Sequence, residues 1–313
     1  MTDDSIGDLR IVSLLPSATE IAVALGLGGN LVGRSHECDF PETVKALPVC
    51  TSTRLEKGLR SAEIDRRVQE IVTQGLSMYE VDAELLRALK PDLILTQTAC
   101  AICAVTPDDL KTALADWMGD PPALISTAPD TLDDVWADLR AVGAAAGRHA
   151  KAETVIQRLR GRLETLNARR LPETLQPRIA AIEWFDPLMM AGNWIPELVA
   201  IAGGEPLFAK PGEHSAFLDW DALVAADPDL LILMPCGYQI PQSLADIEAV
   251  SGDPRWTRMR AVKAGHVYIA DGHHFFNRPG PRLVESAQIV AEIIADWRGE
   301  DTDRLPHWMR YSG

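Results

Sequence analysis

The chain has 313 residues, of which 47% are hydrophobic and 24% are charged, as in a soluble globular protein with room for two domains. Its formal net charge of -15 argues against nucleic-acid binding, because nucleic-acid-binding proteins neutralise phosphates with lysine and arginine. No segment approaches the ~20 consecutive apolar residues that cross a bilayer.

The N-terminus and the cysteines indicate a cellular location. Residues 1–8 have neither the basic segment nor the apolar segment of a secretory signal. The five cysteines are odd in number, and a chain of this length needs no disulfides to hold its core. We therefore expect a cytoplasmic protein with reduced cysteines, or a periplasmic one if a signal peptide has been removed.

The first part of the chain reads as a parallel α/β lobe, residues 1–130. A helix is expected from Ser17 to Gly26, since Ser17 and Glu20 have the spacing of a capping box. Amphipathic helices lie between short apolar runs, which is the pattern of a parallel sheet covered by helices. The runs that predict buried strands are residues 10–16, 31–35, 48–51 and 92–96.

A helical segment, residues 131–172, separates this lobe from a second one, residues 173–313. It contains a helix at 131–146 and a long backbone helix at 149–170, whose apolar residues recur on one face. In the second lobe, strands are expected at 179–182, 230–234 and 266–270, and helices at 196–201 and 282–297.

The two lobes repeat a sequence pattern. Residues 82–95 resemble residues 219–232, and in both segments a helix leads through Pro-Asp into a buried strand. The predicted fold class is therefore α/β, with two Rossmann-like lobes joined by a single long backbone helix and a ligand cleft between them.

Residues 15–20 (LPSATE), residues 90–95 (KPDLIL) and the single joining helix resemble the helical-backbone family of periplasmic binding proteins. Members of that family carry cobalamin, iron–siderophore, haem or metal ions to ABC importers. Residues 35–41, 100–105 and 276–282 are most similar to its cobalamin-binding branch. The resemblance implies capture of cobalamin or a related corrinoid in the cleft, and importer docking through Glu20 and Glu197.

The cysteines offer an alternative. His36 and Cys38 follow the second predicted strand, and Cys100 and Cys103 follow the fourth, so all four residues are expected near one edge of the sheet. Thiolate and imidazole are ligands of zinc and softer metals, so these residues could hold a metal ion or cluster. Buried cysteines that pack as small apolar groups would give the same pattern.

An enzyme that uses the thiols or a bound cofactor is a further alternative. The chain has no phosphate-binding G-x-x-x-x-G-K, no G-x-S-x-G and no H-E-x-x-H. These missing signatures favour a binding protein.

The second lobe supplies imidazoles and aromatic rings after its strands. His273 and His274 suit a metal or the cobalt of a corrinoid, although histidines that are simply hydrogen-bonded in a loop are equally expected. Trp184 and Trp194 could cover a flat macrocycle or pack in the core. The predicted ligand contacts are Ser17, His36, Glu37, Thr51, Gln97, Glu183, Trp184, Trp194, His214, Tyr238, His273, His274 and Phe276.

Overall fold

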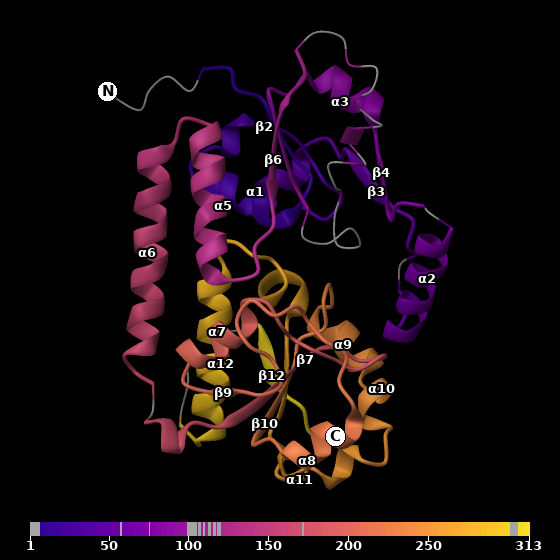
Figure 1. Ribbon diagram of the computed structural model, residues 1–313, viewed down its shortest axis with the longest axis vertical. Coiled ribbons are helices and arrows are strands. Elements are labelled where there is room, and N and C mark those ends of the chain that lie inside the picture. Colours follow the sequence, from indigo (N-terminus) through magenta and orange to yellow (C-terminus); the bar gives the residue numbers. More distant parts are fainter. Residues whose placement is uncertain are drawn as a thin grey trace. The chain divides into compact units, whose positions relative to one another are not determined.

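The computed structural model describes residues 7–56, 58–74, 76–98, 105, 108, 110, 111, 114, 117, 120–170, 172–300 and 306–313. The chain forms two compact units. Unit 1 comprises 1–58, 66–129 and 133–158, and unit 2 comprises 59–65, 130–132 and 159–313. The chain enters unit 2 for the last time within helix α6 (His149–Asn167) (Figure 1). The domain boundaries at residues 130 and 172, and the ligand cleft, stay predictions.

Unit 1 is built on a parallel sheet with the strand order β2-β1-β5-β6. Its strands are β1 (Ile11–Ser13), β2 (Leu31–Arg34), β5 (Leu93–Gln97) and β6 (Ala123–Thr127). The helices associated with it along the chain are α1 (Pro16–Ala24), α2 (Ser61–Thr73), α3 (Ala83–Leu89), α5 (Leu132–Ala145) and α6, with 3-10 turns η1 (Gly28–Asn30) and η2 (Glu42–Ala46).

Two expectations for unit 1 are wrong in detail. The third strand was expected in the parallel sheet at 48–51, but only Val49 joins that sheet there, through a single parallel bridge to Arg34. The following strand, β3 (Thr51–Thr53), pairs antiparallel with β4 (Tyr79–Val81) in a separate two-stranded sheet. The capping box does not form either, because α1 begins at Pro16, a residue whose missing N–H and fixed φ suit the first helical position. Ser17 and Glu20 therefore lie inside the helix.

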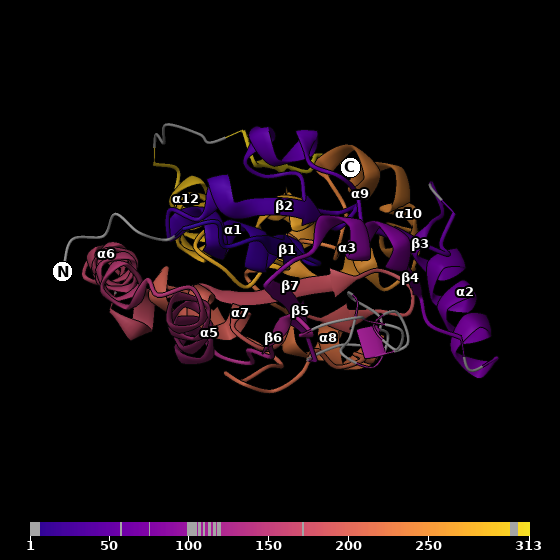
Figure 2. The ribbon, with the colours of Figure 1, turned by 90° about the horizontal axis from the view of Figure 1, so that it is seen from above.

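Helices α5 and α6 lie side by side in both views (Figures 1 and 2). The Arg140 guanidinium on α5 donates two hydrogen bonds to the Glu153 carboxylate on α6, at 2.6 and 3.2 Å. Gly143 allows the close approach, since a Cβ there would lie 2.8 Å from the Cβ of Ala152.

Unit 2 has a six-stranded sheet with the order β12-β11-β10-β7-β8, and β9 also pairs with β7. The central strands β7, β10 and β11 are parallel, whereas β8 and β12 are antiparallel to their neighbours. The strands are β7 (Arg178–Trp184), β8 (Met189–Met190), β9 (Glu205–Pro206), β10 (Leu230–Leu233), β11 (Val267–Ala270) and β12 (Trp308–Arg310).

The helices of unit 2 cover both faces of this sheet. They are α7 (Ile195–Ile201), α8 (Trp220–Ala226), α9 (Ile240–Asp246), α10 (Glu248–Ser251), α11 (Arg260–Lys263) and α12 (Leu283–Trp297), with 3-10 turns η3 (Glu173–Leu175) and η4 (Trp256–Arg258) and a π-helical turn η5 (Gly272–Phe276). Among the described residues, no helix combines the length and the apolar character that crossing a membrane requires.

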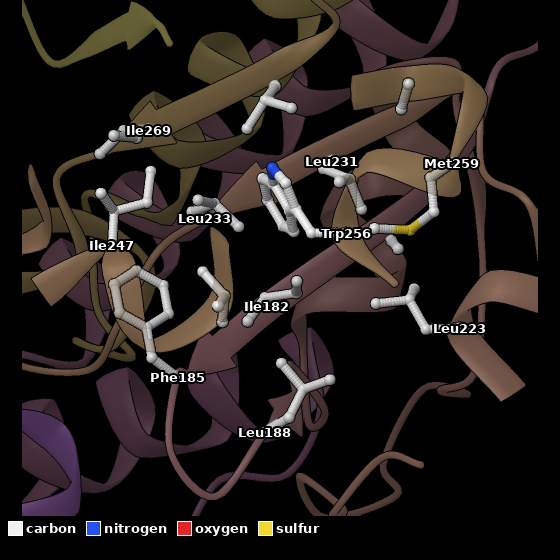
Figure 3. Packing of buried hydrophobic residues seen from close by; sticks show 14 of the residues in the cluster. Ile182, Phe185, Leu188, Leu223, Leu231, Leu233, Ile247, Trp256, Met259 and Ile269 are labelled. Atoms are coloured by element: carbon white, nitrogen blue, oxygen red, sulfur yellow. The ribbon is translucent and has the colours of Figure 1, made fainter. Parts of the chain in front are cut away.

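The core of unit 2 follows from the alternation of side chains along its strands. On one face, Ile182, Leu231 and Ile269 pack with Trp256 and Met259 (Figure 3). On the other face, the Tyr268 hydroxyl donates a 3.0 Å hydrogen bond to the Asp296 carboxylate on α12.

The internal sequence repeat has a common local geometry. Asp82 and Asp219 are N-caps, and each carboxylate accepts backbone N–H bonds from the first turn of its helix, α3 or α8. Lys90 and Asp227 end these helices in the left-handed conformation, with φ of 46° and 44°.

The aspartate of the Pro-Asp that follows each repeated helix hydrogen-bonds to the start of a central strand of its sheet. The Asp92 carboxylate accepts the backbone N–H of Arg10 at 2.8 Å, just before β1. The Asp229 carboxylate accepts the backbone N–H of Arg178 at 2.9 Å, where β7 starts. The backbone N–H groups of Asp92 and Asp229 return a bond to the same two residues, both at 2.9 Å. Each aspartate therefore satisfies both backbone groups of the residue that leads into its central strand.

Two early segments of the chain are held by carboxylates that come much later. The backbone N–H of Ser61, at the start of α2, donates to Asp246 at 2.8 Å. The backbone N–H of Leu132, at the start of α5, donates to Glu197 at 2.8 Å. These bonds satisfy N–H groups that have no partner within their own helices.

Candidate functional site

In unit 1, a small polar cluster lies at the carboxyl ends of β1 and β2. It consists of the hydroxyls of Ser13 and Thr19 and the thiol of Cys38. The Thr19 hydroxyl lies 2.8 Å from the Ser13 hydroxyl and 3.0 Å from the Cys38 sulfur, and Cys38 is fully buried. The Cys38 thiol donates to the Ser13 carbonyl oxygen at 3.8 Å. This contact requires the protonated thiol, whereas a metal requires the thiolate.

The geometry of Cys38 therefore suits a buried thiol that packs as a small group. Cys100 and Cys103 lie outside the described residues. The expected cluster of three thiols and its metal stay predictions.

His36 follows β2 and is fixed by Thr51. The Thr51 hydroxyl oxygen accepts the backbone N–H of His36 at 3.1 Å and lies 2.9 Å from its Nδ1. When the hydroxyl donates to Nδ1, the imidazole carries its proton on Nε2, so His36 offers a hydrogen-bond donor at that atom. Its ring centroid also lies 5.7 Å from that of Tyr79.

The other predicted contacts of unit 1 are less exposed than a ligand-facing role suggests. Ser17, Thr51 and Gln97 are 4%, 6% and 7% exposed. Glu37 is half-buried, and its backbone N–H donates to the Ser35 hydroxyl at 3.1 Å.

The proposed docking carboxylates need a correction. Glu20 is 3% exposed, because it lies on a buried side of α1, so it does not present a surface carboxylate. Glu197 is half-buried and accepts the backbone N–H of Leu132. Docking through Glu197 stays a prediction.

In unit 2, the carboxyl end of β7 meets the loop that contains His214. The Ser215 hydroxyl donates to the Glu183 carboxylate at 2.8 Å and accepts the backbone N–H of Gly192 at 3.1 Å. Gly192 has no room for a Cβ, which would lie 2.5 Å from the Glu213 carbonyl oxygen. Burial raises the pKa of Glu183, and the Ser215 hydrogen bond and His214 offset part of this effect.

The predicted aromatic contacts gather around the π-helical turn η5. The Trp184 and Tyr238 rings pack edge to face with centroids 5.5 Å apart. The Tyr238 carbonyl accepts the backbone N–H of His273 at 3.0 Å, and the Trp194 indole N–H donates to the Phe276 carbonyl at 2.9 Å. Phe276 is fully buried, so its expected ring contact with a ligand is wrong for this structure, and its backbone holds Trp194 instead.

Asp271 organises the two histidines. One carboxylate oxygen accepts the backbone N–H groups of His273 and His274 at 3.0 and 2.9 Å, and the other lies 2.8 Å from Nδ1 of His274. Burial alone would raise the pKa of the Asp271 carboxyl, but hydrogen bonds from His274 outweigh that effect and hold the pKa below its ordinary value. Gly272 is required here, since a Cβ would lie 2.1 Å from the Pro235 carbonyl oxygen.

The two histidines consequently differ in chemistry. Nη2 of the buried Arg278 lies 2.9 Å from Nε2 of His273. A guanidinium only donates, so this Nε2 accepts and His273 is neutral. In the neutral tautomer in which the Nδ1–H of His274 donates a hydrogen bond to the Asp271 carboxylate, the lone pair of the imidazole lies on Nε2. A carboxylate behind an imidazole is the usual support of a metal-ligating histidine.

Three residues of this site were missed from the sequence: Ser215, Asp271 and Arg278. The sequence did contain a signal for Asp271. An aspartate just before a helical turn is a common N-cap, and Asp271 precedes the turn that carries His273 and His274. Arg278 belongs to a proline-rich segment that reads as scaffold, and only the structure shows its contact with His273.

Comparison with known proteins identifies the family. A family model described as periplasmic binding protein matches residues 11–273. The chain belongs to this family.

Individual relatives and a solved structure are also similar to this chain over most of its length. An uncharacterised ABC transporter substrate-binding lipoprotein, YvrC of Bacillus subtilis (strain 168), is 24% identical over 91% of this chain and 79% of its own length. A vitamin B12-binding protein of Yersinia pestis (strain Pestoides F) is 25% identical over 91% of this chain and 86% of its own. The solved periplasmic haem-binding protein RhuT of Roseiflexus sp. RS-1, in its apo form, matches with a TM-score of 0.68 at 23% identity, over 93% of this chain and 99% of its own.

These findings confirm the family resemblance and the two-lobed α/β fold. They also overturn the expected cytoplasmic location. The family is described as that of periplasmic binding proteins and one relative is a lipoprotein, so both findings point to an extracytoplasmic protein.

Proposed function

We propose that this solute-binding protein carries a metal-bearing tetrapyrrole for an ABC importer, and that cobalamin or a related corrinoid is the leading candidate. A vitamin B12-binding relative and a structurally similar haem-binding protein support this ligand class. The observation that carries the proposal is the Asp271–His274 pair, which lies on a turn hydrogen-bonded to both Tyr238 and Trp194.

The residues present fit such a ligand. A tetrapyrrole is a large flat ring with a metal at its centre, and aromatic side chains cover such a surface at low entropic cost. The half-buried Trp184 and Trp194 would contact the ring, with the buried Tyr238 packed against Trp184, and His274 would provide a nitrogen for the metal. Asp271 would hold the imidazole in the ligating tautomer, as a positioning residue.

Absorption spectroscopy tests the ligand. Aquocobalamin and haemin are titrated separately into the purified protein, and replacement of a water ligand by imidazole changes the visible spectrum. We expect His274→Ala to abolish that change. Asp271→Asn should weaken binding by about 10- to 100-fold, the usual effect of removing the partner of a metal-ligating histidine.

His273→Ala is the matched control, because the Nε2 of His273 already accepts from Arg278. It should retain the spectral change of the parent. If neither compound binds at micromolar protein, the tetrapyrrole is wrong while the fold stands. If His273→Ala and His274→Ala lose the change equally, the assignment of His274 is wrong.

A further inference from the structure

Unit 2 contains a cavity of about 520 Å³ that none of the site loops described above lines. Its walls are the C-terminal half of α6, one side of α12 and the turn that follows α7. The volume lies within the range of small-molecule sites in proteins.

The rim of this cavity carries four arginines in a chain whose net charge is -15. Arg162 is paired with Glu285 at 2.7 Å, and Arg298 is paired with Glu300 at 2.6 Å. Arg169 and Arg170 are exposed, and within the described part of the chain no side-chain partner is found for either.

A carboxylate inside the cavity is already engaged. One oxygen of Glu292 accepts the indole N–H of Trp308 at 2.9 Å, and the other lies 3.3 Å from the Gln288 amide nitrogen. Glu292 is therefore held by neutral donors, and the two guanidiniums of Arg169 and Arg170 remain available to a ligand.

The floor of the cavity consists of small and apolar residues. Ala202, Gly203, Ala291 and Ala295 leave the space that larger side chains would fill, and Leu166 adds apolar surface. A guanidinium binds carboxylate and phosphate groups through paired N–H donors. We propose that this cavity binds a small amphiphilic anion, with its carboxylate or phosphate on Arg169 and Arg170 and its apolar part on the alanines.

The probe is 1-anilinonaphthalene-8-sulfonate, which combines an apolar ring system with an anionic group and fluoresces when bound. Octanoate and octyl phosphate should displace it from the full chain, whereas inorganic phosphate should not. Arg169→Gln/Arg170→Gln should weaken binding by about tenfold, and 0.5 M salt should weaken parental binding, because exposed charges are screened.

The control Arg66→Gln/Arg67→Gln makes the same charge change on two adjacent exposed residues of α2 and should bind as the parent does. Ala291→Leu keeps every charge and fills the floor, so it should abolish binding of the fluorescent probe. Circular dichroism verifies that each variant is folded.

Vesicles of anionic phospholipid separate two sources of the ligand. Displacement by octyl phosphate alone indicates a free amphiphile, and additional binding to vesicles that needs Arg169 and Arg170 indicates a lipid headgroup; both support the proposal. Equal binding by the parent and the Arg169/Arg170 variant, or by the parent and Ala291→Leu, would overturn it and leave the arginines as partners of the α6 C-terminus.

Discussion

Asp138 places a carboxylate on the packed side of α5, and its ionisation should destabilise the protein at neutral pH. It lies beside the buried residues Val135 and Leu139. One oxygen is buried and has no hydrogen-bond partner among the described residues. Burial, and then the charge of Asp134, raise the pKa of Asp138 from 3.8 to about 7.

The sign and size of the effect follow from this shift. Between pH 4 and pH 7 the folded state holds a proton that the unfolded state has lost, so stability falls as pH rises through this window. A carboxyl pKa raised from 3.8 to about 7 corresponds to a destabilisation of at most about 4 kcal/mol, because a tenfold change in proton affinity is worth about 1.36 kcal/mol. Asp138 is half-buried, so solvent screening reduces the expected cost to about 1–2 kcal/mol above pH 7.

Asp138→Asn keeps the shape of the side chain and removes the charge. Urea unfolding at pH 4.5, 6 and 8 should show the smallest difference between variant and parent at pH 4.5, and a variant about 1–2 kcal/mol more stable at pH 8. Glu164→Gln removes an exposed carboxylate on α6 and should show no such pH dependence. Parent and Asp138→Asn curves that coincide at all three pH values would refute the reasoning.

Three further outcomes are expected. Gly272→Ala should lower the free energy of unfolding by more than about 2 kcal/mol, because its Cβ would overlap the Pro235 carbonyl, whereas Gly29→Ala, where no atom lies within 4 Å, should change it by less than about 0.5 kcal/mol; equal denaturation midpoints would contradict this. Asp219→Ala should cost about 1 kcal/mol through loss of the N-cap of α8, and unchanged hydrogen exchange at the start of α8 would argue against it. A thiol reagent followed by peptide mass spectrometry should label exposed Cys236 before buried Cys38, and the reverse order would show that the packing around Cys38 is misassigned.

The sequence predicted the elements whose signal is local. Apolar runs located β1, β7, β10 and β11, and the spacing of apolar residues located α6. Strands β8 and β9 are two residues long, too short for any periodicity, and they exist because a neighbouring strand pairs with them.

The candidate site divides in the same way. Placing functional residues after parallel strands located His36, Glu183 and the pair of histidines, since that rule depends only on strand ends. The difference between His273 and His274 depends on Arg278 and Asp271, which act through side-chain contacts that no spacing rule describes. The start of α1 shows the competing local signals: proline at the first helical position overrode the capping-box pattern.

The carboxylates that hold Ser61 and Leu132 impose an order in time on the newly made chain. Asp246 follows Ser61 by 185 residues, so at 5–20 residues per second the ribosome needs about 10 to 40 s to supply it. Glu197 follows Leu132 by 65 residues and arrives within about 3 to 13 s. During that interval the starts of α2 and α5 depend on water for their N–H groups. Neither start can reach its final form before its distant carboxylate has been synthesised.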